Sequence, residues 1–308
     1  TFSNETMVAE ALFGASLGVV VTLCCRYCPC LDVAPRDHPQ FLMAAFAILF
    51  MFDLVGIGAA SQFCRASKNV PLALFTSFML SLTSCCALMI SLDAGVPDAL
   101  RPFALSISIL CFFHWSEYAT QAFTHGKDGE KVDVLTEQRE VLSWDSFLLN
   151  HSTAYAVAAV ASWVEFWVQA ALWPNHKSWS NINTFGLTLC VLGEFLRKTA
   201  MLTAGRGFTH IISYSKKQGH KLVTDGVYGL CRHPAYVGWF WWSIGTQLVL
   251  KNPICACLYA GASWTFFNDR IYEEESLLIR FFGHQYIQYQ KRVPVGIPRI
   301  GGYVIESS

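Results

Sequence analysis

Runs of about twenty apolar residues limit what this 308-residue chain can fold into more than any other feature. A helix needs roughly 17–25 mostly apolar residues to cross the hydrocarbon core of a bilayer. Such runs recur along the whole sequence and indicate about eight membrane spans. The candidate spans are 7–25, 41–60, 70–91, 99–123, 151–172, 181–204, 234–250 and 253–267.

The last two candidate spans are short and are separated only by Lys251 and Asn252. Pro253 opens the second of them, and proline is common at the first position of a helix. We therefore expect the two spans to form a tight helical hairpin.

The amino-acid composition agrees with a protein embedded in a membrane. Charged residues make up 14% of the sequence, whereas a soluble domain has about 25%. Hydrophobic residues make up 53%, against about 45–50% in a soluble domain. The prediction is an all-α, polytopic transmembrane bundle. Its parts are four N-terminal spans at 1–123, a loop at 124–150, and a C-terminal membrane domain at 151–308. The net charge of zero gives no indication of a nucleic-acid partner.

The distribution of lysine and arginine sets the expected orientation. Basic residues are enriched on the cytosolic side of membrane proteins. With eight spans, about three times as many Lys and Arg residues fall on the side that holds both termini as on the other side. Both termini should then be cytosolic, together with the long segments 124–150, 205–232 and 268–308.

Cysteine usage predicts no metal site. Most of the 12 cysteines lie within apolar runs, where cysteine behaves as a small hydrophobic residue. Cys24, Cys25, Cys28 and Cys30 are close together, but no second Cys/His pair with the spacing of a zinc site follows. The run at 7–25 has no basic residue before it, so a cleaved signal peptide is not expected.

The densest chemical signal is an Arg-His-Pro-Ala-Tyr-Val-Gly sequence at 232–238, preceded by Gly-Val-Tyr at 226–228. Pro234 should begin a helix, whose free N–H groups and positive dipole end favour an anion. His233 and Tyr236 would supply donors beside it. The alternative is that Arg232 and His233 only anchor the helix at the membrane surface.

A second signal, Arg-Ile-Tyr-Glu-Glu-Glu, occupies 270–275. Arg270 and Glu274 are four residues apart and so share one helix face. They could form only a weak surface ion pair. Alternatively, Arg270 binds a substrate carboxylate and a glutamate serves a cationic ligand. The repulsion among three consecutive glutamates favours the second interpretation.

These motifs resemble the isoprenylcysteine carboxyl methyltransferase family of eukaryotes. Further similarity lies in Asp145–His151, Gly193–Lys198, Trp239–Gln247 and Arg292–Pro294. The resemblance is strong over about 143–303 and weak over 1–110. It implies methyl esterification of the carboxylate of a C-terminal prenylcysteine in processed CaaX proteins, with S-adenosylmethionine as cofactor. It also implies a multi-pass protein of the endoplasmic reticulum membrane, with membrane lipids around it and no obligate protein partner.

Carried over residue by residue, the resemblance places the cofactor pocket in the segments 205–232 and 268–308 and at the start of the span 234–250. Arg270 would hold the substrate carboxylate. Ser213 matches a position that carries an amide in some relatives. The implied cofactor-binding residues are Ser213, His220, Lys221, Leu222, Val223, Tyr228, His233, Pro234, Ala235, Tyr236 and Glu274.

Two other enzyme classes remain as alternatives. An NADPH-dependent sterol or steroid reductase can also carry Arg-His-Pro-x-Tyr, although Glu273–Glu275 would repel a 2′-phosphate. A phospholipid N-methyltransferase shares the cofactor but needs no arginine for a carboxylate. A non-enzymatic channel or scaffold would not explain why the sequence contains these two motifs.

Ionisable residues inside the candidate spans are the weaker candidates. We expect His114 and Glu117 to form a buried hydrogen bond between helices. Glu194, Arg197 and Lys198 could be a snorkelling cluster or part of the site.

Overall fold

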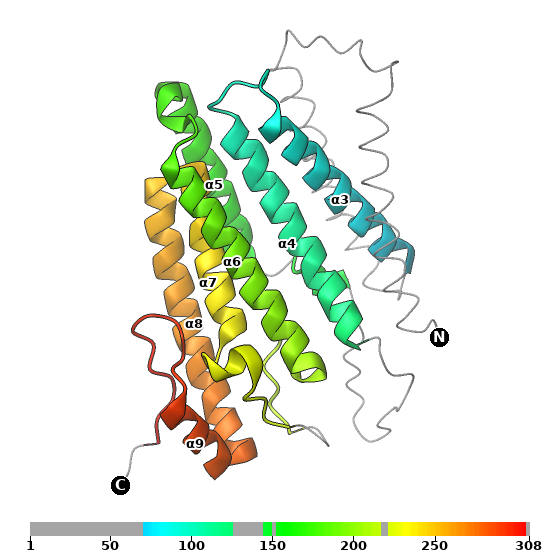
Figure 1. Cartoon of the computed structure of the whole chain (residues 1–308), viewed down its shortest axis with the longest axis vertical. Helices are drawn as coiled ribbons and strands as arrows, with labels where there is room; N and C mark the ends of the chain where they lie inside the picture. The colour runs from blue at the N-terminus through cyan, green and yellow to red at the C-terminus, as the bar shows by residue number, and fades with distance from the viewer. Residues whose placement is uncertain (1–69, 126–143, 150–151, 217–220, 306–308) are drawn as a thin grey trace. The chain divides into compact units, whose positions relative to one another are not determined.

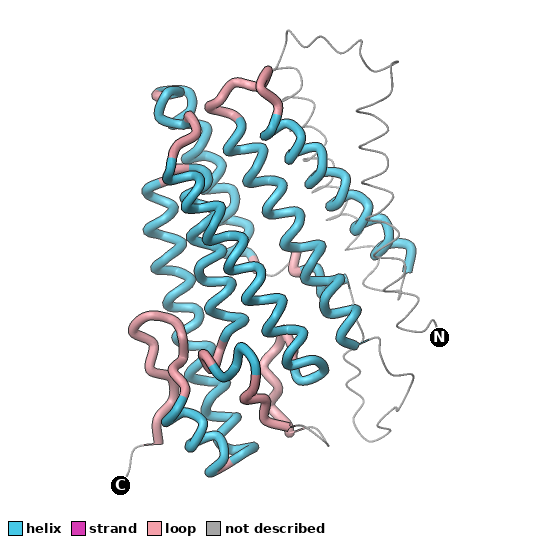
Figure 2. The backbone as a smooth tube through the Cα atoms, in the orientation of Figure 1, coloured by secondary structure: helices cyan, strands magenta, loops and turns pink. Residues whose placement is uncertain are grey.

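A computed structural model describes residues 70–125, 144–149, 152–216 and 221–305. The candidate spans 7–25 and 41–60 and most of the loop 124–150 lie outside these residues. The chain divides into two compact units, one ending at Asn181 and the other starting at Ile182. Helices and loops make up all of the described chain (Figure 2).

The first unit contains three long helices and two short 3-10 helices. These are α3 (Val70–Leu92), α4 (Arg101–His125), η2 (Trp144–Phe147), α5 (Thr153–Leu172) and η3 (Pro174–Lys177). The bounds of α3 and α4 agree with the predicted spans to within two residues. The two helices pack as a hairpin (Figure 1), and the Ser84 hydroxyl lies 3.1 Å from that of Ser108.

His114 on α4 connects three elements of the first unit. Its Nδ1 lies 2.8 Å from the carbonyl oxygen of Phe147 in η2, and its Nε2 lies 3.1 Å from the Tyr155 hydroxyl on α5. The Phe147 ring is fully buried and stacks on Tyr118 at 4.0 Å between centroids. The expected buried helix–helix hydrogen bond is therefore confirmed for His114, and Glu117 is also buried.

The second unit contains the predicted motifs. Its elements are α6 (Asn181–Ala204), η4 (Gly205–Gly207), η5 (Gly226–Gly229), α7 (Pro234–Leu250), α8 (Pro253–Phe282) and α9 (His284–Arg292). The bounds of α6 and α7 are those predicted. The connecting segments between α6 and α7 and after α9 gather at one end of this unit (Figure 2).

Glycines allow α6 and α7 to approach closely. A Cβ atom added at Gly193 would lie 2.5 Å from the Gly238 carbonyl oxygen, and one at Gly186 would lie 2.6 Å from the Val249 nitrogen. Small residues at such spacings let helix backbones touch in membrane proteins. Gly238, the last residue of the Arg-His-Pro-Ala-Tyr-Val-Gly sequence, thus packs against α6.

The expected hairpin between α7 and α8 is present. Lys251 takes a left-handed conformation (φ 53°), its N–H donates to the Leu248 carbonyl, and α8 begins at Pro253. Helix α8 is 30 residues long and ends at Phe282. It continues past the predicted end of the span at 267, through the helical segment expected at 270–274. At about 1.5 Å per residue it is roughly 45 Å long. Its second half carries Arg270 and the three glutamates away from the hairpin turn.

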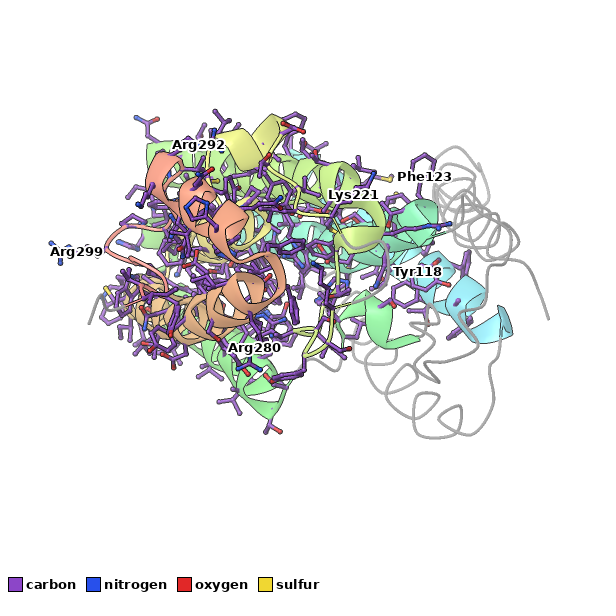
Figure 3. All side chains as sticks on the ribbon, turned by 90° about the horizontal axis from the view of Figure 1, so that it is seen from below. Tyr118, Phe123, Lys221, Arg280, Arg292 and Arg299 are labelled. Carbon is purple, nitrogen blue, oxygen red and sulfur yellow. The ribbon has the colours of Figure 1, made fainter. Side chains whose placement is uncertain are left out.

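A segment after α9, which we call the strap (residues 293–303), folds back over α7 and α8. Val295, Ile297 and Ile300 of the strap are buried in one apolar cluster with Val237 and Ile271. The indole N–H of Trp264 donates to the Pro298 carbonyl at 2.9 Å. Figure 3 looks onto this end, with Arg280, Arg292 and Arg299 pointing outward.

Two of the described helices are long and apolar enough to cross a membrane by length and composition, within Phe75–Leu92 and Thr153–Leu172. Helix α6 carries polar side chains on its buried face and apolar side chains on its exposed face, as helices in a membrane do. It buries Asn183 and Arg197 while exposing Phe185 and Phe195.

Candidate active site

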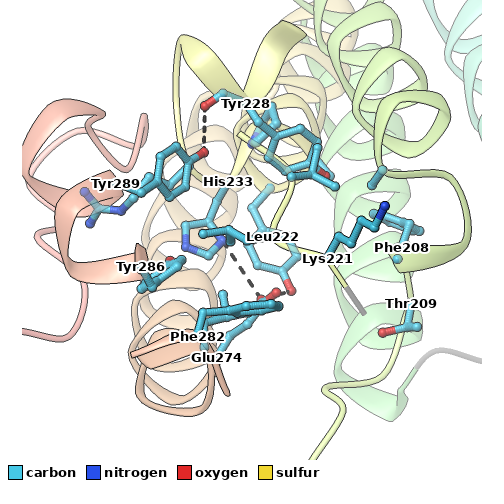
Figure 4. A pocket seen from close by; sticks show the side chains of 18 residues that line it. Phe208, Thr209, Lys221, Leu222, Tyr228, His233, Glu274, Phe282, Tyr286 and Tyr289 are labelled. Carbon is cyan, nitrogen blue, oxygen red and sulfur yellow. Dashed lines mark hydrogen bonds and ion pairs between the residues drawn. The ribbon is translucent and has the colours of Figure 1, made fainter. Parts of the chain in front are cut away.

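One pocket opens at the end of the second unit where the connecting segments gather (Figure 4). The space inside it, counted together with its open mouth, is about 740 Å³. Its walls come from the end of α6, the segments around 207–209 and 221–223, the start of α7, the second half of α8, and α9. The lining residues are Ala204, Gly207, Phe208, Thr209, Lys221, Leu222, Val223, Tyr228, Arg232, His233, Pro234, Ala235, Tyr236, Glu274, Leu278, Phe282, Tyr286 and Tyr289.

The start of α7 is built as the sequence predicts. Pro234 is the first helical residue and His233 precedes it as the N-cap. Pro234, Ala235 and Tyr236 all line the pocket. The end of the helix where positive partial charge accumulates therefore forms part of the pocket wall.

The three consecutive glutamates of α8 have three different partners. Glu273 accepts a hydrogen bond of 2.6 Å from the exposed Tyr214 hydroxyl, and Glu274 accepts one of 2.6 Å from the Tyr236 hydroxyl. Glu275 is completely buried and binds Arg232. Successive helical residues point about 100° apart, and only Glu274 lines the pocket.

Arg270 is connected to the pocket through Tyr236. Its Nε donates to the Tyr236 hydroxyl at 2.9 Å, and its Nη2 donates to the His210 carbonyl. The Tyr236 hydroxyl thus accepts from Arg270 while it donates to Glu274. Arg270 itself is not a lining residue.

Arg232, which lines the pocket, forms a buried ion pair with Glu275, which does not. Arg232 Nε donates to Glu275 Oε1 at 2.7 Å, and His233 Nε2 lies 3.1 Å from the same oxygen. Burial alone would raise the pKa of the Glu275 carboxyl. The hydrogen bonds and positive charge of His233 and Arg232 outweigh burial and hold the pKa at about 2. Glu275 is therefore ionised at neutral pH.

Tyr228 and Tyr289 close another side of the pocket. The Tyr289 hydroxyl donates to the Tyr228 carbonyl at 2.6 Å (Figure 4). Burial raises the pKa of the Tyr228 phenol above its ordinary value. Its hydroxyl therefore stays neutral and donates to the Ala200 carbonyl of α6.

The structure brings most of the predicted cofactor-binding residues to this single pocket, and their role in binding stays a prediction. Those that line it are Lys221, Leu222, Val223, Tyr228, His233, Pro234, Ala235, Tyr236 and Glu274. Ser213 does not line it, and its hydroxyl donates to the Ser215 carbonyl instead. His220 lies outside the described residues.

Several residues that line the pocket were not predicted from the sequence. Leu278 and Phe282 follow Glu274 at intervals of four, so a helix extended through 282 would have indicated them. Phe208 and Thr209 follow α6 without any periodic pattern. Tyr286 and Tyr289 form the buried face of α9. Arg197, named above among the weaker candidates, does not line the pocket. It is 1% exposed, its Nη1 donates to the Ala235 carbonyl at 3.2 Å, and it lies over the Trp239 ring.

Comparisons with known proteins agree with these features. A sequence model of the isoprenylcysteine carboxyl methyltransferase (ICMT) family matches residues 186–280. A Xenopus laevis protein named protein-S-isoprenylcysteine O-methyltransferase is 45% identical over 269 residues, which cover 87% of this chain and 88% of the relative. A Tribolium castaneum protein of the same name is 47% identical over 68% of this chain and 70% of the relative.

A solved structure, described as the eukaryotic intramembrane Ras methyltransferase ICMT, is also similar. It shares 37% sequence identity with a TM-score of 0.79, over 97% of this chain and 99% of that chain. Its intramembrane description agrees with the membrane character that the apolar runs of this chain indicate. The chain therefore belongs to the isoprenylcysteine carboxyl methyltransferase family.

Proposed function

We propose that this protein transfers a methyl group from S-adenosylmethionine to the carboxylate of a C-terminal prenylcysteine in processed CaaX proteins. The observation that carries the proposal is the pocket in the second unit. It gathers residues from the two motifs at 226–238 and 270–275, and Tyr236 connects it to Arg270. Family membership supports the reaction class.

The residues of the pocket fit the proposed cofactor. S-adenosylmethionine supplies, when bound, a methyl group on a positively charged sulfur. Glu274 contributes a negative charge that favours such a cation. The rings of Phe208 and Phe282 offer apolar surface for a purine. Leu222 and Val223 would act chiefly through their backbone groups.

The acceptor needs no general base. A C-terminal carboxylate has a pKa of about 3.5 and is already ionised at neutral pH. When bound, S-adenosylmethionine would supply the methyl group to an oxygen of this carboxylate, with a C–O bond formed for the S–C bond broken, and would leave as S-adenosylhomocysteine. The protein must align the reactants and exclude water, and such alignment can be worth roughly 7–11 kcal/mol. A dry site also favours a transition state in which opposite charges neutralise.

Arg270 is suited to orient the carboxylate through a single contact. Its Nε and Nη2 are engaged by Tyr236 and His210. For Nη1 no hydrogen bond to another described residue is present. One N–H group can therefore hold an acceptor oxygen without a bidentate grip, which would weaken the nucleophile.

The prenyl chain suggests how the acceptor arrives. Moving a CH₂ group from water into an apolar environment is favourable by about 0.8 kcal/mol. The prenyl group therefore prefers the bilayer. We propose lateral entry of the prenyl group between helices and entry of the cofactor from the cytosol. The protein would lie in the endoplasmic reticulum membrane, with about eight spans and both termini cytosolic.

A transfer assay tests the proposed function. Labelled S-adenosylmethionine is offered with a farnesylated cysteine analogue and, separately, with the same cysteine lacking its prenyl group. Base-labile label in the first reaction only is expected. Label in neither, together with NADPH consumption in the presence of a sterol, would contradict the proposal. Base-stable label on a phospholipid would favour an N-methyltransferase instead.

A further inference from the structure

Glu275 is bonded from three separate parts of the second unit. Besides Arg232 and His233 at the start of α7, it accepts hydrogen bonds from the Tyr286 hydroxyl at 3.1 Å and the Gln290 amide at 2.9 Å, both on α9. The backbone N–H of Tyr303, in the strap, donates at 2.9 Å. Three of these partners, Arg232, His233 and Tyr286, also line the pocket.

Arg232 attaches the strap to the same ion pair. Its guanidinium donates to the carbonyls of Val293 at 2.6 Å and Gly301 at 3.1 Å. Its backbone N–H donates to the Pro294 carbonyl at 2.8 Å. The strap is therefore bonded to the turn that begins α7 by side chain and by backbone.

Gly302 brings the strap directly against Glu275. It has a φ of 79°, a conformation that L side chains rarely adopt. A Cβ atom added there would collide with the Glu275 carboxylate and approach Arg232 Nη2. Only glycine fits between the strap and the ion pair. The neighbouring Gly301 has no atom within 4 Å of its Cβ position.

We propose that Glu275 is a positioning residue, and that closure of the strap over Glu275 sets the affinity of the pocket for its cofactor. This inference rests on the proposed function. The strap covers the carboxylate and keeps water from it, which strengthens its bonds to His233 and Tyr286. Those bonds fix the two side chains in the pocket wall, although the strap itself contributes no lining residue.

The position of His233 makes this coupling direct. Its Nε2 faces Glu275, while its Nδ1 lies 4.0 Å from Oε2 of Glu274, the carboxylate proposed to face the cation of the cofactor. A displaced strap would loosen Glu275, let the His233 ring turn, and change the surroundings of Glu274. The prenyl substrate, proposed to be held through Arg270, should be affected less.

Paired glycine variants of the full-length protein test the inference. Gly302→Ala forces the strap away from Glu275, and Gly301→Ala is the matched control. Binding of labelled S-adenosylmethionine is measured by equilibrium dialysis, and Michaelis constants are measured for the cofactor and for the farnesylcysteine analogue. Gly302→Ala should raise the cofactor dissociation constant about tenfold, with the Michaelis constant for farnesylcysteine changed less than about twofold. Gly301→Ala should match the unmodified protein.

A second variant covers the case in which Gly302→Ala does not fold. Trp264→Phe removes the hydrogen bond to Pro298 in the strap and shortens a ring that packs against the apolar cluster beneath the strap. It should raise the cofactor dissociation constant about threefold. Normal cofactor binding by folded Gly302→Ala, or by Trp264→Phe where the first variant is unfolded, would overturn the inference. Absence of cofactor binding by the unmodified protein would overturn the proposed function itself.

Discussion

The hydroxyl of Tyr236 and the carboxylate of Glu274 are joined by a hydrogen bond of 2.6 Å, and the same hydroxyl accepts a bond from Arg270. Two residues of α8 that share one face are thus bridged by a residue of α7. In the proposed reaction, Glu274 faces the methyl donor and Arg270 the acceptor. Tyr236 therefore connects the two binding functions.

Tyr236→Phe should impair the use of both substrates. The variant leaves two charged groups without their shared partner, and hydrogen bonds to charged groups contribute about 1.5–3 kcal/mol. We expect kcat/KM to fall at least about tenfold for both the cofactor and farnesylcysteine. Tyr272→Phe is the matched control, because this exposed tyrosine lies on α8 between Arg270 and Glu274 and, among the described residues, has only a ring contact with Tyr303. A loss confined to one substrate would contradict the bridging role.

Arg270→Ala should separate acceptor binding from cofactor binding. Turnover should fall and the Michaelis constant for farnesylcysteine should rise, by about tenfold or more in kcat/KM. Cofactor affinity should change less than about threefold, because the bond between Tyr236 and Glu274 remains. Arg280→Ala, at the exposed end of α8, should behave as the unmodified protein. Equal loss of cofactor binding would show that Arg270 is misassigned.

Glu275→Gln should destabilise the second unit by about 3–5 kcal/mol, because it leaves Arg232 buried without its counter-charge. The pKa of Glu275, about 2, lies below the ordinary 4.5. The carboxylate therefore stabilises the folded protein above pH of about 4.5, and this contribution is lost as the pH falls from about 4.5 towards 2. Thermal unfolding in detergent across this range should show the loss in the unmodified protein and a weaker pH dependence in the variant. Parallel pH profiles would contradict the pairing.

Gly193→Ala should destabilise the contact between α6 and α7. The added methyl group meets the Gly238 carbonyl, and overpacking of this kind costs about 1–3 kcal/mol. Gly261→Ala is the control, since nothing lies within 4 Å of its Cβ position on the exposed side of α8. The control should leave Tm unchanged or raise it slightly, because alanine favours a helix over glycine by about 0.5–1 kcal/mol. Equal Tm values for the two variants would argue against close packing at Gly193.

Local sequence signals predicted much of the second unit. Apolar runs gave the bounds of α6 and α7, and proline at the first helical position marked the starts of α7 and α8. The motif residues that line the pocket were predicted through the family resemblance that these local motifs carry. The extension of α8 to Phe282 was not predicted, because the apolar run stops near 267 and the helix beyond it is held by packing and by bonds from its polar residues.

The role of Glu275 could not be predicted from the sequence. Three identical neighbours carry no information about which of them is buried, and the partners that decide it lie far along the chain. Arg232 is 43 residues away and Tyr303 is 28 residues away. The strap has no helical or strand periodicity, so its place over the ion pair depends on the tertiary structure alone.

Cofactor binding by a pair of neighbouring glutamate variants tests the central claim most directly. Labelled S-adenosylmethionine is titrated against the unmodified protein, Glu274→Gln and Glu273→Gln, with excess NADPH as a competitor in a parallel series. Glu273 bonds the exposed Tyr214 and does not line the pocket. The account predicts affinity at least about tenfold weaker for Glu274→Gln, unchanged affinity for Glu273→Gln, and no competition by NADPH. Equal affinities for the two variants, or displacement by NADPH, would contradict it.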